Sequence, residues 1–201
     1  VRLQNHERET VEARWVDYLA SSARIRAAGG EPAPLVVQSP TLGALRGKRL
    51  VIDQSAGTGH VVGPGTLEAA SDPAGSNRDR ALPERLRVAW RDRLELRFFL
   101  QNQPDKPTNA PADRLAAADR TEGLRSAVFH GNVRANHPRF MMTGDRLGVH
   151  LRRPDGASAA DPELAAIEAT AAENNLVRVT AKPENAVEES LAIDAARLQI
   201  A

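Results

Sequence analysis

Apolar and polar residues alternate along most of this chain with a period of two, the spacing of a β-strand that buries one face. In the clearest case, Leu94, Leu96 and Phe98 alternate with charged residues. Because clusters of Gly, Pro, Asn and Asp separate the short alternating segments, the pattern favours an all-β sandwich, barrel or solenoid. The predicted strands are 35–38, 49–53, 60–62, 86–90, 93–99, 127–135, 139–143, 146–151, 176–180 and 191–194.

Two segments depart from this alternation. Residues 7–20 carry apolar side chains at helical spacing, and residues 161–173 begin with Asp161 and Pro162, a common start of a helix, before an Ala-rich run. Local propensity favours a helix in both segments, but neighbouring strands can override it. The residues therefore leave helix and strand open in both places.

Three polar, Pro-rich stretches predict loops, at 71–85, 101–123 and 152–162. The second is long for a loop within a compact domain, which indicates an insertion or a disordered segment. Strand patterning of the same kind resumes after each stretch, so none of them is predicted to be a linker between domains.

A weak internal repeat is also present. The octapeptides RGKRLVID (46–53) and TGDRLGVH (143–150) align without a gap, and each has a second Gly-bearing segment nearby, at 60–67 and 129–135. The C-terminal residues 176–200 follow the same logic more loosely. Recurring strand–turn–strand units bury their apolar faces by stacking. A chance match between common residue types is the alternative.

Composition narrows the class of protein. The 201 residues carry 27 Lys and Arg against 26 Asp and Glu, which rules out a strongly basic surface for nucleic acid. The absence of Cys excludes disulfides and thiolate metal sites. Apolar runs are too short to span a membrane. Because the chain begins with Val1 and no signal-peptide core follows, we expect it to be a segment of a longer or processed chain.

The residues that could support catalysis form no recognisable motif. The five histidines, His6, His60, His130, His137 and His150, lack the spacing of a zinc helix, and there is no G-x-S-x-G sequence. The segment GTGHVVGPG (57–65) lacks the Lys and Ser or Thr of a phosphate-binding loop, so its glycines indicate a turn or bulge. We predict no catalytic residues, no metal site and no cofactor.

The predicted inward faces combine large apolar side chains such as Phe129 and Met142 with small residues such as Gly131 and Ala135. Such a face is typical of an ordinary core, and also of a groove for acyl chains, in which small residues leave room and Met adapts its shape. The residues alone favour the core.

A family resemblance favours the acyl-chain groove over the ordinary core. The run 127–151 resembles the repeat unit of the OstA-like (LptA) family of periplasmic lipopolysaccharide-transport bridge proteins, and 45–70 and 167–200 resemble it more loosely. The insertions at 71–85 and 101–123 and the low aromatic content depart from the compact bridge protein. The residues that match the family motif are Gly131, Asn132, Val133, Asp145 and Leu147.

The resemblance implies a V-shaped β-jelly-roll of stacked antiparallel strands, with an apolar groove for lipopolysaccharide or other lipid acyl chains. It implies a domain over 23–201, preceded by a segment 1–22 that is a helix or a first strand. It also implies a periplasmic location and edge-to-edge pairing with similar modules, with no nucleic acid as partner. The residues expected to line the groove are Ile52, Val88, Trp90, Leu96, Phe98, Phe129, Val133, Phe140, Met142, Leu147, Val149 and Leu151.

Two alternatives remain at this stage. The first is a structural β-solenoid scaffold that pairs with partners through its strand edges and carries no lipid. The second, which the residues favour least, is a hydrolase acting on an envelope polymer through its His- and Asp-bearing loops, with His130, His137 and His150 as the candidates.

Overall fold

The chain forms one antiparallel β-sheet that is folded over on itself. The computed structural model describes residues 1–4, 9–31, 33–39, 43–71, 84–100, 121–138, 140–152, 163–172, 175–181 and 192–200. Within these ranges every regular element is a strand except a 3-10 turn at Ala20–Ser22, so the predicted all-β class is confirmed. Most of the three predicted loops, including the order of 101–120, lie outside the described residues. The described part contains no helix long and apolar enough to cross a membrane.

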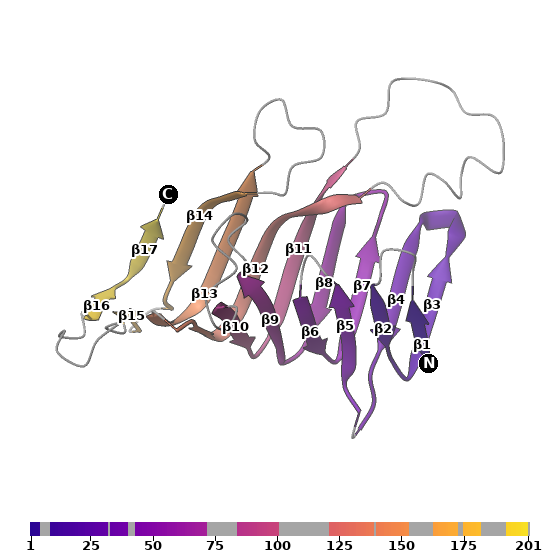
Figure 1. The fold of residues 1–201 in the computed structure, drawn as a ribbon, viewed down its shortest axis with the longest axis horizontal. Helices are drawn as coiled ribbons and strands as arrows, with labels where there is room; N and C mark the ends of the chain where they lie inside the picture. Colours follow the sequence, from indigo (N-terminus) through magenta and orange to yellow (C-terminus); the bar gives the residue numbers. More distant parts are fainter. Residues whose placement is uncertain are drawn as a thin grey trace, which may run out of the picture.

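Seventeen strands make up the sheet (Figure 1). They are β1 (Arg2–Gln4), β2 (Thr10–Glu12), β3 (Trp15–Leu19), β4 (Arg24–Ala28), β5 (Leu35–Ser39), β6 (Gly43–Gly47), β7 (Arg49–Asp53), β8 (Thr58–Val62), β9 (Gly65–Ser71), β10 (Glu84–Trp90), β11 (Arg93–Leu100), β12 (Thr121–Asn136), β13 (Phe140–Arg152), β14 (Glu163–Thr170), β15 (Val177–Ala181), β16 (Ala192–Ala195) and β17 (Arg197–Ile200).

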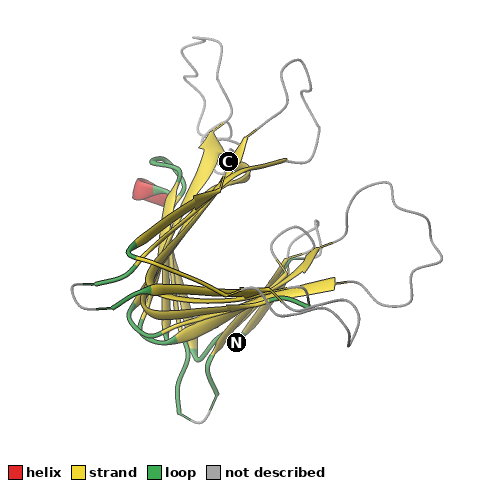
Figure 2. Cartoon of the chain, turned by 90° about the vertical axis from the view of Figure 1, so that its left-hand side faces the viewer, coloured by secondary structure: helices red, strands yellow, loops and turns green. Residues whose placement is uncertain are grey.

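The pairings divide these strands into two walls. Wall A contains β3, β4, β7, β8, β11, the first part of β12, the last part of β13, β14 and β17, in that order. Wall B contains β1, β2, β5, β6, β9, β10, the last part of β12, the first part of β13, β15 and β16. The walls share one corner and diverge from it, so the end-on view is a V (Figure 2).

The long strands β12 and β13 cross the corner from one wall to the other. On β12, His130 pairs with Arg146 and Val133 pairs with Gly144, so β12 carries one residue more than β13 between these pairs. Such a bulge bends a strand and increases its twist. The two predicted strands 139–143 and 146–151 are therefore the two arms of one bent strand, Phe140–Arg152.

Cross-strand register places the core between the walls. Alternate residues on each strand face inward, and directly paired inward residues form continuous apolar rows. The row of wall A nearest the corner is Val16, Ala27, Leu50, Val61, Leu94, Phe129, Leu147, Ala169 and Leu198. Wall B has inward residues such as Leu35, Trp90 and Val133 next to the corner. Its next row out is Leu3, Val11, Val37, Leu45, Leu67, Val88, Ala135, Met142, Val179 and Ile193.

Both segments that helical propensity favoured are strands. Within 7–20 the structure has β2 and β3, which pair with β5 and β4. Within 161–173 it has β14, which pairs with β13 on one side and β17 on the other. Neighbouring strands satisfy the backbone hydrogen bonds of these segments, and this tertiary context outweighs local propensity. The division of the chain into 1–22 and 23–201 stays a prediction.

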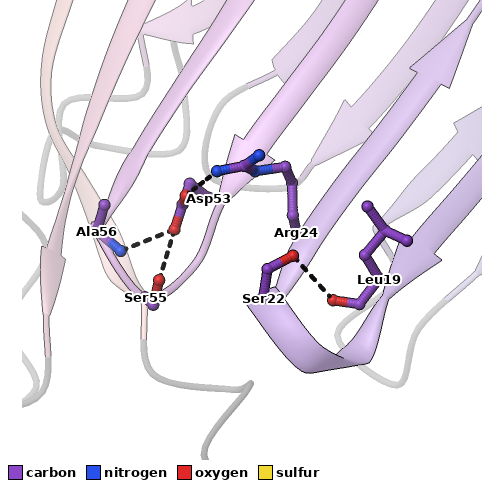
Figure 3. Close-up of polar contacts among 6 residues, drawn as sticks. All are labelled: Leu19, Ser22, Arg24, Asp53, Ser55 and Ala56. Atoms are coloured by element: carbon purple, nitrogen blue, oxygen red, sulfur yellow. Dashed lines mark hydrogen bonds and ion pairs between the residues drawn. The ribbon is translucent and has the colours of Figure 1, made fainter.

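The turn between β7 and β8, at the end of these strands away from the corner, is built around Asp53 (Figure 3). Asp53 Oδ1 accepts hydrogen bonds from the Ser55 hydroxyl at 2.6 Å and the Ala56 N–H at 3.0 Å, and Oδ2 accepts one from Arg24 Nη2 at 2.9 Å. These bonds, with that from Ser55 the most important, hold the pKa of Asp53 well below its usual range. Asp53 thus joins the β7–β8 turn to β4.

Candidate functional site

The residues predicted to line a groove fall into two groups by exposure. The first group is almost fully buried where the walls meet, with exposed fractions of 1% for Val88 and Phe129 and 4% for Met142. These side chains belong to one buried cluster that contains residues of both walls, and they form a packed floor. The members of this group are Val88, Trp90, Leu96, Phe129, Val133, Met142 and Leu147.

The second group lies further out on the inner faces and is only half-buried. Ile52, Phe98, Phe140 and Val149 pack against the floor with one side and remain partly accessible with the other. Leu151 is also half-buried, but it lies beyond a register shift after His150. Further half-buried residues that were not predicted for the groove also pack against the core. The alternation of their strands could have indicated some of them. They are Val37, Leu86, Leu124, Ile167 and Val179.

The centre of the floor is an aromatic pair. The ring centroids of Trp90 and Phe129 are 5.4 Å apart, with the planes tilted by 53°. Trp90 Nε1 donates a hydrogen bond to the carbonyl of Gly63 at 3.0 Å, so the one polar atom of the indole is satisfied. A Cβ on Gly65 would lie 2.3 Å from the Trp90 ring, so only glycine lets these two strands approach here.

The motif residues of the family resemblance lie at the corner. Gly131 and Asn132 have φ values of 82° and 46°, the left-handed region that Gly and Asn adopt most readily. Asp145 accepts hydrogen bonds from the Ala172 N–H at 2.7 Å and from Asn175 Nδ2 at 3.3 Å. The motif therefore shapes the corner and ties it to the next strands, rather than forming a reactive centre.

The two aligned octapeptides occupy equivalent corners. In each, a Gly is followed by a corner residue, Lys48 in the first copy and Asp145 in the second. The Leu that follows, Leu50 or Leu147, is buried on the inner face of wall A. Each copy also lies beside a strand path that crosses the corner in the opposite direction. This shared position argues against a chance match between the two segments.

The histidines do not converge on a site. His130 and His150 lie on the outer face of β12 and β13, whereas His137 is in the turn between them and stacks on Phe140. His60 lies on the outer face of β8, and His6 is outside the described residues. Among the residues that the structure describes, no three His, Asp or Glu side chains are grouped so that they could hold a metal ion.

His130 lies beside a carboxylate and is partly buried. Its pKa is lowered, chiefly by burial, and the neighbouring Glu95 opposes that shift. Its Nε2 lies 3.5 Å from Glu95 Oε1. The imidazole therefore lies beside a carboxylate on the outer face of the sheet.

Ion pairs cover the outer face of the C-terminal half of the sheet. Glu168 binds both Arg146 and Arg197, and the hydrogen bond from Arg197 is the main reason that the pKa of Glu168 is lowered. Arg178 donates to Asp194 through Nε at 2.9 Å, and this bond raises the pKa of Arg178. These pairs are exposed, so each contributes little to stability.

The apolar rows end in exposed side chains at both edges of the sheet. At the N-terminal edge, Leu3 on β1 is 49% exposed and Tyr18 on β3 is 43% exposed. At the C-terminal edge, Ile193 on β16 is 42% exposed. Each of these residues faces inward in its row but, among the described strands, has a paired neighbour on one side only.

Comparison with known proteins supplies no family for this chain. The chain matches no protein-family model and no curated protein. Among solved structures it is similar to LptH, the LptA homologous periplasmic component of the conserved lipopolysaccharide transport device from Pseudomonas aeruginosa. The TM-score is 0.46 with 10% sequence identity, over 81% of this chain and 93% of that chain. The function is therefore argued from the geometry of this sheet.

Proposed function

We propose that the chain is a non-enzymatic module of the cell envelope that holds lipid acyl chains, such as those of lipopolysaccharide, between its two walls. The observation that carries this proposal is the half-buried second group of inward residues: Ile52, Phe98, Phe140 and Val149. A closed core would bury these side chains fully. An acyl chain between the diverging walls would cover them. Each Å² of apolar surface that it removes from water would contribute about 25 cal/mol of favourable binding free energy.

The floor and the second group have different roles in this proposal. The floor residues hold the walls together, because their side chains are already covered by protein. The bound chain would contact the half-buried group instead. This separates the predicted groove residues into those that maintain the fold and those that would touch lipid.

The edges support the second part of the proposal, which is that copies or similar modules pair end to end. Edge strands present unpaired backbone groups that a further strand can satisfy. A second module placed against β1 and β3, or against β16 and β17, would continue both apolar rows. It would cover Leu3 and Tyr18 at one edge or Ile193 at the other.

Photo-crosslinking in cells that make lipopolysaccharide tests the lipid contact. A photoreactive residue replaces Val149, on the inner face of β13, and in the matched control it replaces His150, the next residue on the outer face. We expect a lipopolysaccharide adduct from position 149 and none from position 150. No adduct at either position, in protein shown to be folded, would refute lipid carriage and favour the scaffold alternative.

A matched pair of charge substitutions tests the edges. Ile193→Lys places a charge at the end of an inner row, and Val62→Lys makes the same change at a residue of similar exposure inside the sheet. We expect the first to reduce association in sedimentation velocity, because a buried unpaired charge opposes pairing. Equal association of both variants and the parent would contradict the edge model.

The scaffold alternative and the lipid-carrying proposal differ in what they predict for a charge on the inner face. A scaffold needs its edges but not an apolar inner face, so Val149→Asp would leave its partner binding unchanged. In the lipid-carrying proposal this variant loses binding of a fluorescent acyl probe, cis-parinaric acid. The control His150→Asp, on the outer face, keeps it, provided that circular dichroism shows both variants folded.

A further inference from the structure

A pocket of about 730 Å³ lies at the corner of the sheet, and its lining includes Trp90 of the floor but none of the half-buried residues of the proposed acyl site. Arg46, Arg49 and Thr66 contribute to it, and each is next in sequence to a buried leucine of an inner row. Because successive strand residues point to opposite faces, these three side chains belong to the outer face. The loop between β4 and β5 forms the opposite side of the pocket through Gly29, Gly30, Glu31 and Pro34.

Three cations from one short segment line this pocket: Arg46 at the end of wall B, Lys48 at the corner, and Arg49 at the start of wall A. All three residues contribute to one pocket although they come from two walls. The aliphatic part of Lys48 passes over the corner glycine Gly63, whose Cβ position is 3.0 Å from Lys48 Cδ. Lys48 is therefore packed against the backbone of the corner at Gly63.

The charge of these residues is not neutralised by neighbours that the structure describes. Elsewhere on the outer face Arg93, Arg146 and Arg178 each have a carboxylate within 4.0 Å. In the described ranges no ion pair involves Arg46, Lys48 or Arg49. Glu31 is the one carboxylate among the lining residues, so the lining has an excess of two positive charges.

We propose that this corner pocket binds a phosphate monoester or diphosphate group. Guanidinium groups bind phosphate oxygens in a two-pronged geometry, and an ammonium adds a compact charge. A phosphate monoester carries about 1.5 to 2 negative charges near pH 7 and a diphosphate carries more, so either group matches the positive excess in the pocket. The Thr66 hydroxyl lies directly across from Arg46 in the strand pairing and adds a donor for the same group.

The proposed phosphate site uses Arg46, Lys48 and Arg49, which are not among the half-buried residues of the proposed acyl site, although Trp90 of the floor also lines the pocket. The group could belong to a lipid headgroup or to a soluble compound. Pyrophosphate therefore serves as the soluble probe, and phosphatidylcholine vesicles with and without phosphatidic acid serve as the membrane probes.

The test uses two double variants of equal charge. Arg46→Gln with Arg49→Gln removes the two guanidinium groups from the pocket, whereas Arg26→Gln with Arg97→Gln removes two exposed guanidinium groups on the outer face of wall A. We expect the pocket variant to weaken pyrophosphate binding in calorimetry by about tenfold or more, as loss of a charge-assisted hydrogen bond would. The control variant should bind within about twofold of the parent.

Each outcome decides the proposal. Binding of pyrophosphate that is lost only in the pocket variant supports a soluble ligand. Binding only to vesicles with phosphatidic acid, again lost only in the pocket variant, supports a lipid headgroup. Binding to neither probe, or equal losses in both double variants, would overturn the proposal. Circular dichroism and urea unfolding establish that both variants keep the fold.

Discussion

Replacement of Phe129 by Ala tests whether the floor of the V is a packed core or a space for ligand. The side chain is 1% exposed, pairs with the Trp90 ring, and lies in its row between Leu94 and Leu147. Truncation of such a side chain leaves a cavity and costs about 3–5 kcal/mol. The lost aromatic contact falls within that range.

The matched control is Tyr18→Ala, an aromatic truncation on the inner face at the edge of wall A. Tyr18 is 43% exposed, so its loss should cost about 1 kcal/mol. With an m-value of about 2 kcal/mol per M urea, Phe129→Ala should lower the unfolding midpoint by about 2 M and Tyr18→Ala by about 0.5 M. Tryptophan fluorescence and circular dichroism report the transition.

The reasoning is refuted if Phe129→Ala costs no more than Tyr18→Ala. That result would mean that the floor residues are not packed against one another, and that the space between the walls extends down to the corner. If the parent protein is too unstable for the alanine variant to fold, the comparison uses leucine at both positions. Phe129→Leu should cost about 1–1.5 kcal/mol, and Tyr18→Leu, at a half-exposed site, should cost clearly less.

Three further predictions concern single residues. Asp53→Asn should make the free energy of unfolding depend less on pH in the acid range. The stability that comes from the lowered pKa of Asp53 is present above about pH 3.9 and is lost as pH falls toward the pKa of the folded state. Urea unfolding midpoints from pH 5 to pH 2 measure this. Gly65→Ala should cost about 1–3 kcal/mol because its Cβ would overlap the Trp90 ring, whereas Gly30→Ala would meet only a flexible side chain and should cost less in the same assay. Because burial lowers the pKa of His130, this imidazole binds a proton at higher pH in the unfolded chain than in the folded one. Stability should therefore decline as pH falls below about 6.5. His130→Asn should reduce that decline, which urea midpoints from pH 7 to pH 5 measure.

Alternation predicted much of the strand content, because one face of each strand is buried. Arg49–Asp53 was predicted with its observed bounds, and Leu35–Ser39 and Val177–Ala181 within a residue at each end. The strands Arg24–Ala28 and Gly43–Gly47 were missed. They are short and contain Ala, Arg and Gly, residues with low strand propensity, and only pairing with their neighbours makes them strands.

The candidate site was harder to predict, because facing inward and being accessible are different properties. The alternation shows correctly that Phe98 and Phe129 share the inner side, but it contains no information about their distance from the corner. That distance depends on which residues of β11 and β12 pair, and on where the sheet bends. Gly131 and Asn132 were predicted as matches to the family motif, and their role in the bend became clear only from the positive φ values.

Exposure along β11 connects the bend to function. Leu94 is fully buried, Leu96 is 3% exposed, and Phe98, two residues further from the corner, is half-buried. In two sheets that pack face to face, side chains from both inner faces would interdigitate along the whole strand. Here the walls diverge with distance from the corner (Figure 2), and the exposure of the inward side chains of β11 rises in the same direction. Polar residues would stabilise an empty V equally well at such positions. Their apolar character is the reason to favour a bound hydrocarbon chain over a simple scaffold, and Val149→Asp distinguishes the two.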